Sequence, residues 1–177
     1  MRSIIVGFSG RKRSGKTTLS SAVAERLGWH RVSFGDFIRN EARRKGLGES
    51  IEILQDLGAT FMENSDEFCR AVLKQAEWKP GRHLVIDGMR HTKMMDSLLR
   101  LTNPSKLLLI FIRVDERTLK DRRGKEKQEN IEKHSTEVEV LTTLPVRADL
   151  VIDGARPAKV LIQEILVWLR KKIEIEA

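Results

Sequence analysis

The sequence contains one cysteine, Cys69, and no tyrosine in 177 residues. A single cysteine excludes an intrachain disulfide and fits a reducing compartment, where such a small side chain is usually buried. Aromatic residues make up only 5% of the chain, which leaves little surface for stacking nucleic-acid bases. No stretch reaches the roughly 20 apolar residues that span a bilayer, and the apolar run at residues 4–8 is too short for a signal peptide. We therefore expect a cytoplasmic protein with no membrane partner.

Acidic residues are outnumbered by basic ones. The chain has 25 Asp and Glu against 33 Lys and Arg, a net charge of +8 and a pI of about 9.9. This surplus indicates an anionic partner. Small phosphorylated molecules and nucleic acid both fit the charge, and the scarcity of aromatic residues favours the small molecules. The oligomeric state stays open.

Short apolar runs alternate with segments of helical periodicity along the chain. The expected strands are residues 4–8, 30–34, 83–86, 107–112 and 150–152. The expected helices include residues 16–27, 92–101 and 157–171. Strands that alternate with helices predict an α/β fold with a five-stranded parallel sheet flanked by helices.

The length of the chain fits a single domain, residues 1–177. Its expected core segments are residues 1–35, 80–120 and 147–177. Residues 36–79 form a predicted helical insertion between them, and residues 121–146 a highly charged helical excursion. The glycines that interrupt the periodicity of the insertion are Gly46, Gly48 and Gly58.

The stretch GRKRSGKT, from Gly10 to Thr17, matches the pattern GxxxxGK[ST]. It follows an expected strand and opens an expected helix, as a loop that turns its backbone N–H groups onto phosphates requires. In this interpretation Lys16 reaches the β- and γ-phosphates of ATP, and the Thr17 hydroxyl holds Mg²⁺. The candidate nucleotide-binding residues are Gly10, Arg11, Lys12, Arg13, Ser14, Gly15, Lys16, Thr17 and Thr18. A plain glycine-rich turn is the alternative, and Arg11 and Arg13 fit either phosphate contact or solvation.

A second motif, VIDGMR, places Asp87 directly after a buried strand. Open α/β sheets bind their ligands at the carboxyl ends of the strands. Asp87 is therefore a candidate partner of Mg²⁺, or the N-cap of the following helix, and the two roles are compatible. Arg90 lies three residues further on, at the same edge.

A third motif, SFGDFIRN, again follows a strand and carries Asp36 and Arg39. Asp36 is either a helix N-cap or part of the site. Arg39 lies one turn into the expected helix. Arg39 and Arg90 near one edge would make a clamp for a second phosphate, because a guanidinium binds phosphate through two parallel hydrogen bonds.

Together, the motifs GxxxxGKT, SxGDxxR and hhDGxR resemble those of the adenylate kinase and nucleoside monophosphate kinase family over nearly the whole chain. The resemblance implies a P-loop NTPase fold of the nucleotide kinase type. It also implies that Arg39 and Arg90, with Asp36, bind the phosphorylated acceptor in the insertion, residues 36–79. The DGMR of this chain is one residue shorter than the family's usual DGFPR.

Other segments resemble a neighbouring branch, the deoxynucleoside monophosphate kinase-like and dephospho-CoA kinase-like P-loop proteins. These segments are the cradle GRKRSGKTT, then EILQDLGATF, DGMRHTKMMDSL, HSTE and ADLVIDG, in this order along the chain. The acceptor implied by this branch is either a nucleotide or dephospho-coenzyme A.

The segment VDERTLKDRR resembles the helix that leads into the lid of the same family. The resemblance makes residues 121–146 a short lid and assigns Arg122, with Arg123 beside it, to the transferring phosphoryl group. Positive charge and exclusion of water favour phosphoryl transfer at such a position. A solvated helix with i,i+4 ion pairs is the alternative.

Weaker signals remain at four places. His91, beside Arg90, and His134 and Glu137, within the charged excursion, either touch substrate or lie on the surface. The GARPA turn, residues 154–158, lies where the family's adenine-binding loop would be, or is an ordinary strand-to-helix turn.

These features predict an enzyme that moves the γ-phosphoryl of ATP to a small phosphorylated acceptor, with Lys16, Asp87, Arg90 and Arg122 as catalytic residues. A GTPase would need NKxD-like and DxxG motifs, and a motor or AAA+ ATPase a longer chain with a sensor region. The alternative is a nucleotide-gated module that acts with RNA or a protein partner, which the charge of +8 supports.

Overall fold

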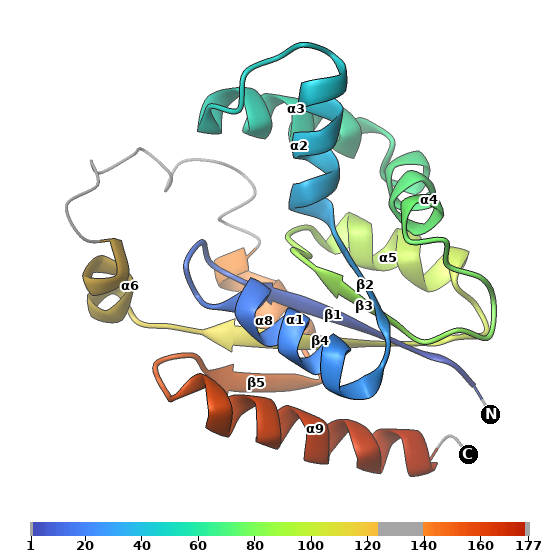
Figure 1. Cartoon of the computed structure of the whole chain (residues 1–177), viewed down its shortest axis with the longest axis vertical. Coiled ribbons are helices and arrows are strands. Elements are labelled where there is room, and N and C mark those ends of the chain that lie inside the picture. Colours follow the sequence, from blue (N-terminus) through green and yellow to red (C-terminus); the bar gives the residue numbers. More distant parts are fainter. Residues whose placement is uncertain (1, 124–139, 176–177) are drawn as a thin grey trace.

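The computed structural model describes residues 2–123 and 140–175, which form a parallel sheet with helices on both faces (Figure 1). The strands are β1 (Ile4–Gly10), β2 (His30–Ser33), β3 (Leu84–Asp87), β4 (Lys106–Arg113) and β5 (Leu150–Asp153). The helices are α1 (Lys16–Leu27), α2 (Phe34–Arg44), α3 (Ile51–Glu63), α4 (Ser65–Gln75), α5 (Thr92–Leu101), α6 (Glu116–Arg123), α8 (Leu144–Arg147) and α9 (Ala158–Ile175). The predicted five-stranded parallel sheet is confirmed.

The strand order is β2–β3–β1–β4–β5, so β1 lies at the centre, between β3 and β4. All seven residues of β1 are buried, as expected for a strand covered on both faces. Side chains alternate along it: Ile4, Val6 and Phe8 pack on the face covered by α1 and α9, while Ile5 packs on the face covered by α4 and α5. Because β1, β2 and β3 are parallel, the loops that follow them emerge at the same edge of the sheet. The predicted motifs lie at this edge.

Gly7 lies on the second face of β1, directly beneath Met89. A Cβ at position 7 would collide with the Sδ of Met89, whose side chain is fully buried. The amides of Gly88 and Met89 both donate to the carbonyl oxygen of Phe8, at 3.1 and 3.0 Å. Strand β1 and the turn after β3 are thus joined by both packing and backbone hydrogen bonds.

Gly58 does not interrupt the helical insertion. It lies inside α3, where a Cβ would come within 3.3 Å of the Cδ1 of Ile38, so the glycine lets α2 and α3 approach each other closely. The helical break falls instead after Arg44, where Gly46 adopts the left-handed backbone with φ 68°. Ser50 then begins α3 by accepting the amide of Ile53.

Cys69 is fully buried on α4. Burial raises the pKa of the Cys69 thiol to about 12. The thiolate, which is the reactive form, is therefore disfavoured. The expectation of a small buried side chain is confirmed.

His83 lies just before β3, where its Nδ1 accepts the amide of Ile4 at 3.0 Å and its ring stacks on Trp29 with centroids 4.3 Å apart. Burial lowers the pKa of His83 below its usual value. As the pH falls, the unfolded chain therefore takes up a proton at this histidine before the folded protein does. The free energy of unfolding is expected to decrease as the pH falls below about 6.5, and the contribution of neutral His83 is fully present above that pH.

Urea unfolding at several pH values, for the wild type and His83→Gln, measures this contribution. The variant should show a shallower loss of stability between pH 7.5 and 5.5, because it cannot take up the proton. The fluorescence of Trp29, which lies against the ring, offers a local signal for the same titration. An unchanged pH slope in the variant would mean that His83 does not carry the effect.

Candidate active site

The segment from Gly10 to Thr17, which joins β1 to α1 and is called the phosphate loop below, turns its backbone inward. Gly10, Arg13 and Gly15 all have positive φ, at 145°, 68° and 95°. A Cβ at position 10 would lie 2.6 Å from the carbonyl oxygen of Ile112 on β4, so only glycine fits there. Among the described residues no side chain caps α1, which leaves its N-terminal amides facing the loop. The loop has the geometry of a phosphate-binding turn.

Lys16 fills the centre of this loop. Its Nζ donates to the carbonyl oxygens of Gly10 and Arg11 at 2.7 and 2.6 Å, and lies 3.5 Å from the Oγ of Ser14. Only 8% of Lys16 is exposed. A mobile surface lysine would spread over many rotamers, whereas this ammonium is held where the loop curves. The role predicted for Lys16, contact with the β- and γ-phosphates, stays a prediction.

Asp87 ends β3 and pairs in register with Phe8 of β1 and Ser33 of β2. Only 2% of it is exposed. Its Oδ2 accepts a hydrogen bond from the Thr17 Oγ1 at 2.9 Å and another from the Arg31 Nη2 at 2.6 Å. The structure therefore brings together Thr17 and Asp87, the two predicted magnesium partners.

Asp87 does not cap a helix, because His91 is the N-cap residue of α5. The Asp87 carboxylate and the Thr17 hydroxyl are hard oxygen donors, which suit Mg²⁺. Within residues 2–123 and 140–175, no group of three or more His, Cys, Asp or Glu side chains could hold a metal alone. The donor set fits a cation that arrives with phosphates and keeps most of its other ligands from them and from water.

At the start of α2, the Oγ of Ser33 accepts the amide of Asp36 at 3.2 Å, so Ser33 is the N-cap of α2. The alternative that Asp36 caps this helix is wrong. Asp36 lies in the first turn of α2, and its Oδ1 forms an ion pair with the Arg39 Nη1 at 2.5 Å. The Oδ2 of Asp36 lies 3.9 Å from the Nη1 of Arg31. About half of each of the Asp36 and Arg39 side chains is exposed. Both remain accessible to a ligand.

The turn after β3 lies against the start of α2. Gly88 has φ 88°, and a Cβ there would lie 3.8 Å from the amide nitrogen of Gly35. Arg90 follows this turn and is half-buried. The segments that carry Arg39 and Arg90 are therefore neighbours at one edge of the sheet.

Helix α6 is attached to the phosphate loop through Arg122. Its Nη1 donates to the carbonyl oxygen of Arg13 at 3.1 Å, and its Nη2 to that of Gly154 at 2.6 Å. Gly154 itself packs closely, since a Cβ there would lie 3.0 Å from the carbonyl oxygen of Ser14 and 2.6 Å from the Cγ2 of Ile112. Arg122 thus joins α6, the phosphate loop and the turn after β5.

Arg11 is not simply solvated, and its contact with phosphate stays a prediction. Its guanidinium forms an ion pair with Glu116 of α6, and only 13% of the side chain is exposed. Arg11 is therefore a second connection between the loop and α6. Of the other loop residues, Lys12 and Arg13 are half-buried, and Thr18 is exposed on the first turn of α1.

Sequence reasoning missed Arg31, Ser20 and Glu116. Arg31 lies two residues before Ser33 on β2, hence on the same face, and β2 pairs with β3. Its Nε also donates to the Oγ of Ser20 at 3.0 Å. The sequence predicts which residues of β2 share a face, but it does not predict which strand lies beside β2. His134, Glu137 and residues 124–139 of the predicted lid lie outside the described residues.

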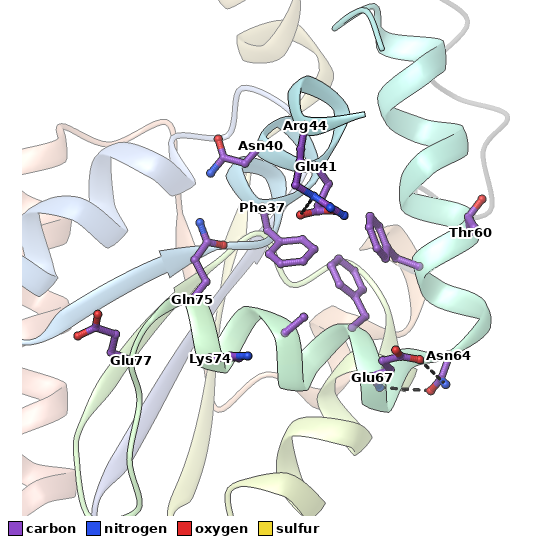
Figure 2. Close-up of a pocket in the computed structure, with 13 residues that line it drawn as sticks. Phe37, Asn40, Glu41, Arg44, Thr60, Asn64, Glu67, Lys74, Gln75 and Glu77 are labelled. Atoms are coloured by element: carbon purple, nitrogen blue, oxygen red, sulfur yellow. Dashed lines mark hydrogen bonds and ion pairs between the residues drawn. The ribbon is translucent and has the colours of Figure 1, made fainter. Parts of the chain in front are cut away.

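A cavity of about 840 Å³ lies between α2, α3 and α4 (Figure 2). Asn40, Glu41 and Arg44 of α2 and Lys74 and Gln75 of α4 are among the residues that line it. Neither the phosphate loop nor any of the predicted acceptor-binding side chains lines it. This cavity is separate from the phosphate loop.

A protein-family model described as an AAA domain matches residues 7–140. The chain belongs to this AAA-domain family. The matched segment includes the phosphate loop, Asp87 and Arg122. A UPF0200 protein of Aeropyrum pernix is 32% identical over 97 residues, which are 55% of this chain and 52% of that relative. The chain thus spans about half the length of that curated relative.

Solved structures of similar fold include kinases. A shikimate kinase from Acinetobacter baumannii, in complex with shikimate, has a TM-score of 0.63 at 16% identity and covers 97% of this chain and 95% of its own. The APS kinase CysC of Mycobacterium tuberculosis, in complex with AMPPNP and APS, has a TM-score of 0.58 at 16% identity and covers 96% and 98%. The AAA-domain protein therefore has the P-loop kinase fold, and the predicted P-loop kinase-like family is confirmed. None of its described helices is both long and apolar enough to cross a membrane.

Proposed function

We propose that this AAA-domain protein is an ATP-dependent phosphotransferase that moves the γ-phosphoryl of ATP to a small phosphorylated acceptor, most simply a ribo- or deoxynucleoside monophosphate. One observation carries the proposal. The buried Asp87 carboxylate is contacted from the phosphate loop by Thr17 and from the neighbouring strand by Arg31, which also lies 3.9 Å from Asp36. One carboxylate therefore joins the phosphate loop, through the Thr17 hydroxyl, to the strand that leads into α2, through the Arg31 guanidinium.

The donor half is the loop around Lys16. An ammonium has three N–H donors, and that of Lys16 now uses loop carbonyls, so phosphate oxygens can take over one or more of these bonds. The N-terminal amides of α1 add further donors. Thr17 and Asp87 would hold Mg²⁺, which, when bound, neutralises charge on the β- and γ-phosphates.

The acceptor half is built on α2 and the turn after β3. Arg39 is half-exposed and Arg90 half-buried, on adjacent segments. Guanidinium groups suit a phosphate because they bind two of its oxygens at once. The fold is shared with a shikimate kinase and an APS kinase, whose names specify small acceptors.

The chemistry is displacement at phosphorus. An acceptor phosphate oxygen forms a bond to the γ-phosphorus as the bond to the β-phosphate oxygen breaks, and ADP leaves. The protein forms no covalent intermediate; it aligns the two phosphates and stabilises the charge on the transferring group. In the proposed assignment, Lys16 and Arg122 supply that charge from opposite sides of the loop.

A coupled ADP-release assay with ATP, Mg²⁺ and a panel of acceptors tests the function. The panel contains ribo- and deoxynucleoside monophosphates, dephospho-coenzyme A, shikimate and a short RNA. We expect one monophosphate to stimulate ADP release by a large factor over the rate with water alone, and chromatography to show the corresponding diphosphate. Dephospho-coenzyme A as the stimulating acceptor would keep the kinase assignment and change the substrate.

A slow rate that ignores every small acceptor but responds to RNA would contradict the kinase assignment. It would favour the nucleotide-gated module, which the net charge of +8 supports. RNA affinity that falls steeply with salt concentration would strengthen that reading, because binding to a phosphate backbone releases counterions.

A further inference from the structure

Arg31 occupies a position that the predicted motifs do not explain. Its guanidinium spans three elements: Nη2 is 2.6 Å from the Oδ2 of Asp87 on β3, Nε is 3.0 Å from the Oγ of Ser20 on α1, and Nη1 is 3.9 Å from the Oδ2 of Asp36 on α2. Only 21% of the Arg31 side chain is exposed. It is held at the point where the donor and acceptor halves of the site meet.

The contact that matters is the one to Asp87. A single carboxylate oxygen, Oδ2, accepts both the Arg31 Nη2 and the Thr17 Oγ1 hydrogen bonds. In this arrangement the Thr17 hydroxyl acts as a donor, with its hydrogen directed at Asp87. The Thr17 oxygen keeps its lone pairs for a cation, but a cation held by Asp87 Oδ2 would have to share that oxygen with the Arg31 hydrogen bond, so the two compete.

Charge adds to this competition. Arg31 keeps its positive charge at any physiological pH. A cation bound to Asp87 would therefore lie a few ångströms from a fixed like charge in a nearly buried environment, where screening by water is weak. Asp36 offers the guanidinium a second carboxylate within reach, so Arg31 can leave Asp87 without losing all ionic contact.

We propose that Arg31 is a positioning residue that competes with the divalent cation for Asp87 and so lowers the affinity of the nucleotide-bound protein for Mg²⁺. This inference rests on the proposed function, since it assumes that Thr17 and Asp87 hold the cation of a magnesium nucleotide. By holding Asp87 in place, Arg31 keeps the carboxylate oriented while the cation is absent. By its charge, it raises the Mg²⁺ concentration that the enzyme needs.

Electron paramagnetic resonance of Mn²⁺ tests the competition without any turnover. The protein is saturated with a non-hydrolysable ATP analogue, and Mn²⁺ affinity is measured for the wild type and Arg31→Gln. We expect the variant to bind Mn²⁺ roughly tenfold more tightly, within the usual range of coupling between neighbouring sites. Arg31→Lys keeps the charge but loses the fork that reaches both Ser20 and Asp87, so its gain should be smaller.

Arg26→Gln is the matched control. Arg26 is exposed in the last turn of α1, and its replacement changes the net charge equally without touching the site. Its Mn²⁺ affinity should stay within about twofold of the wild type. Thermal melting confirms that each variant is folded. If Arg31→Gln does not fold, Arg31→Lys tests the proposal, and we expect its Mn²⁺ affinity to be severalfold higher than that of the wild type.

Asp87→Asn tests separately whether Asp87 binds the cation and whether Arg31 competes with it. A large loss of Mn²⁺ affinity in that variant establishes Asp87 as a partner of the cation. Unchanged or weaker Mn²⁺ binding in Arg31→Gln then overturns the competition while leaving the proposed function standing. Unchanged Mn²⁺ binding in Asp87→Asn instead overturns the cation site itself, and the role of Arg31 with it.

Discussion

Replacing Lys16 by alanine is expected to lower kcat for acceptor-stimulated ADP release by about 1,000-fold or more, the loss typical when a preorganised charge on the transferring group is removed. Lys16 is almost fully buried and donates to two loop carbonyls, so its ammonium is held at one place in the loop. Steady-state kinetics at saturating ATP measure kcat, and titration with a fluorescent ATP analogue measures how much nucleotide binding remains.

The control for Lys16 is Lys171→Ala, which removes one exposed lysine from α9. This variant should keep wild-type kinetics. The Lys16 variant should retain the melting temperature of the wild type within a few degrees, because the loop carbonyls that its ammonium contacts can bind water once the side chain is gone. Full activity in a folded Lys16→Ala protein would remove the phosphate loop from the mechanism.

Replacing Arg122 by alanine is expected to lower kcat by about 100-fold or more, as when one preorganised donor is deleted from an active site. The substitution removes a positive charge beside the phosphate loop. It also removes the hydrogen bonds to the carbonyl oxygens of Arg13 and Gly154 that connect α6 to the loop. Arg122→Lys should recover little activity, since an ammonium does not reproduce the planar fork that reaches both carbonyls. Kinetics for both variants, with ATP and acceptor varied in turn, measure the effect.

Arg123 provides the comparison, because it is the adjacent arginine of α6. Arg123→Ala should stay within about twofold of wild-type kcat, because the phosphoryl contact is assigned to Arg122 and most substitutions away from a site have small effects. A larger loss at Arg123 than at Arg122 would reverse the assignment of the two arginines.

The sequence predicted the turn between β1 and α1 because most of what shapes its backbone is local. Gly10, Gly15 and Lys16 lie within seven residues, and the backbone they require follows from their own conformational preferences and from α1. The place of Asp87 also followed from a short-range pattern, a buried strand that ends in a carboxylate. Both predictions needed no knowledge of which strands are neighbours.

Arg31 could not be predicted in this way. Its role depends on β2 lying beside β3 rather than beside β1, which is a property of the whole sheet. The pairing of Arg11 with Glu116 is similar, since the two residues are 105 positions apart. At the start of α2, Ser33 and Asp36 were both suitable N-caps by residue type, and only the backbone geometry decided for Ser33.

The contact between Gly7 and Met89 has a consequence for how the protein can move. Since β1 and the turn after β3 are joined by this packing and by two backbone hydrogen bonds, we expect Asp87 to keep its place beside β1 when a ligand binds. Helix α6 contacts the loop between β1 and α1 through the side chains of Arg11 and Arg122. We expect a closing motion to be carried by α6, and by α2 and α3 outside the sheet, rather than by β1 and β3. Under the proposed function, the choice of acceptor would then change through these helices while the loop and Asp87 keep their arrangement.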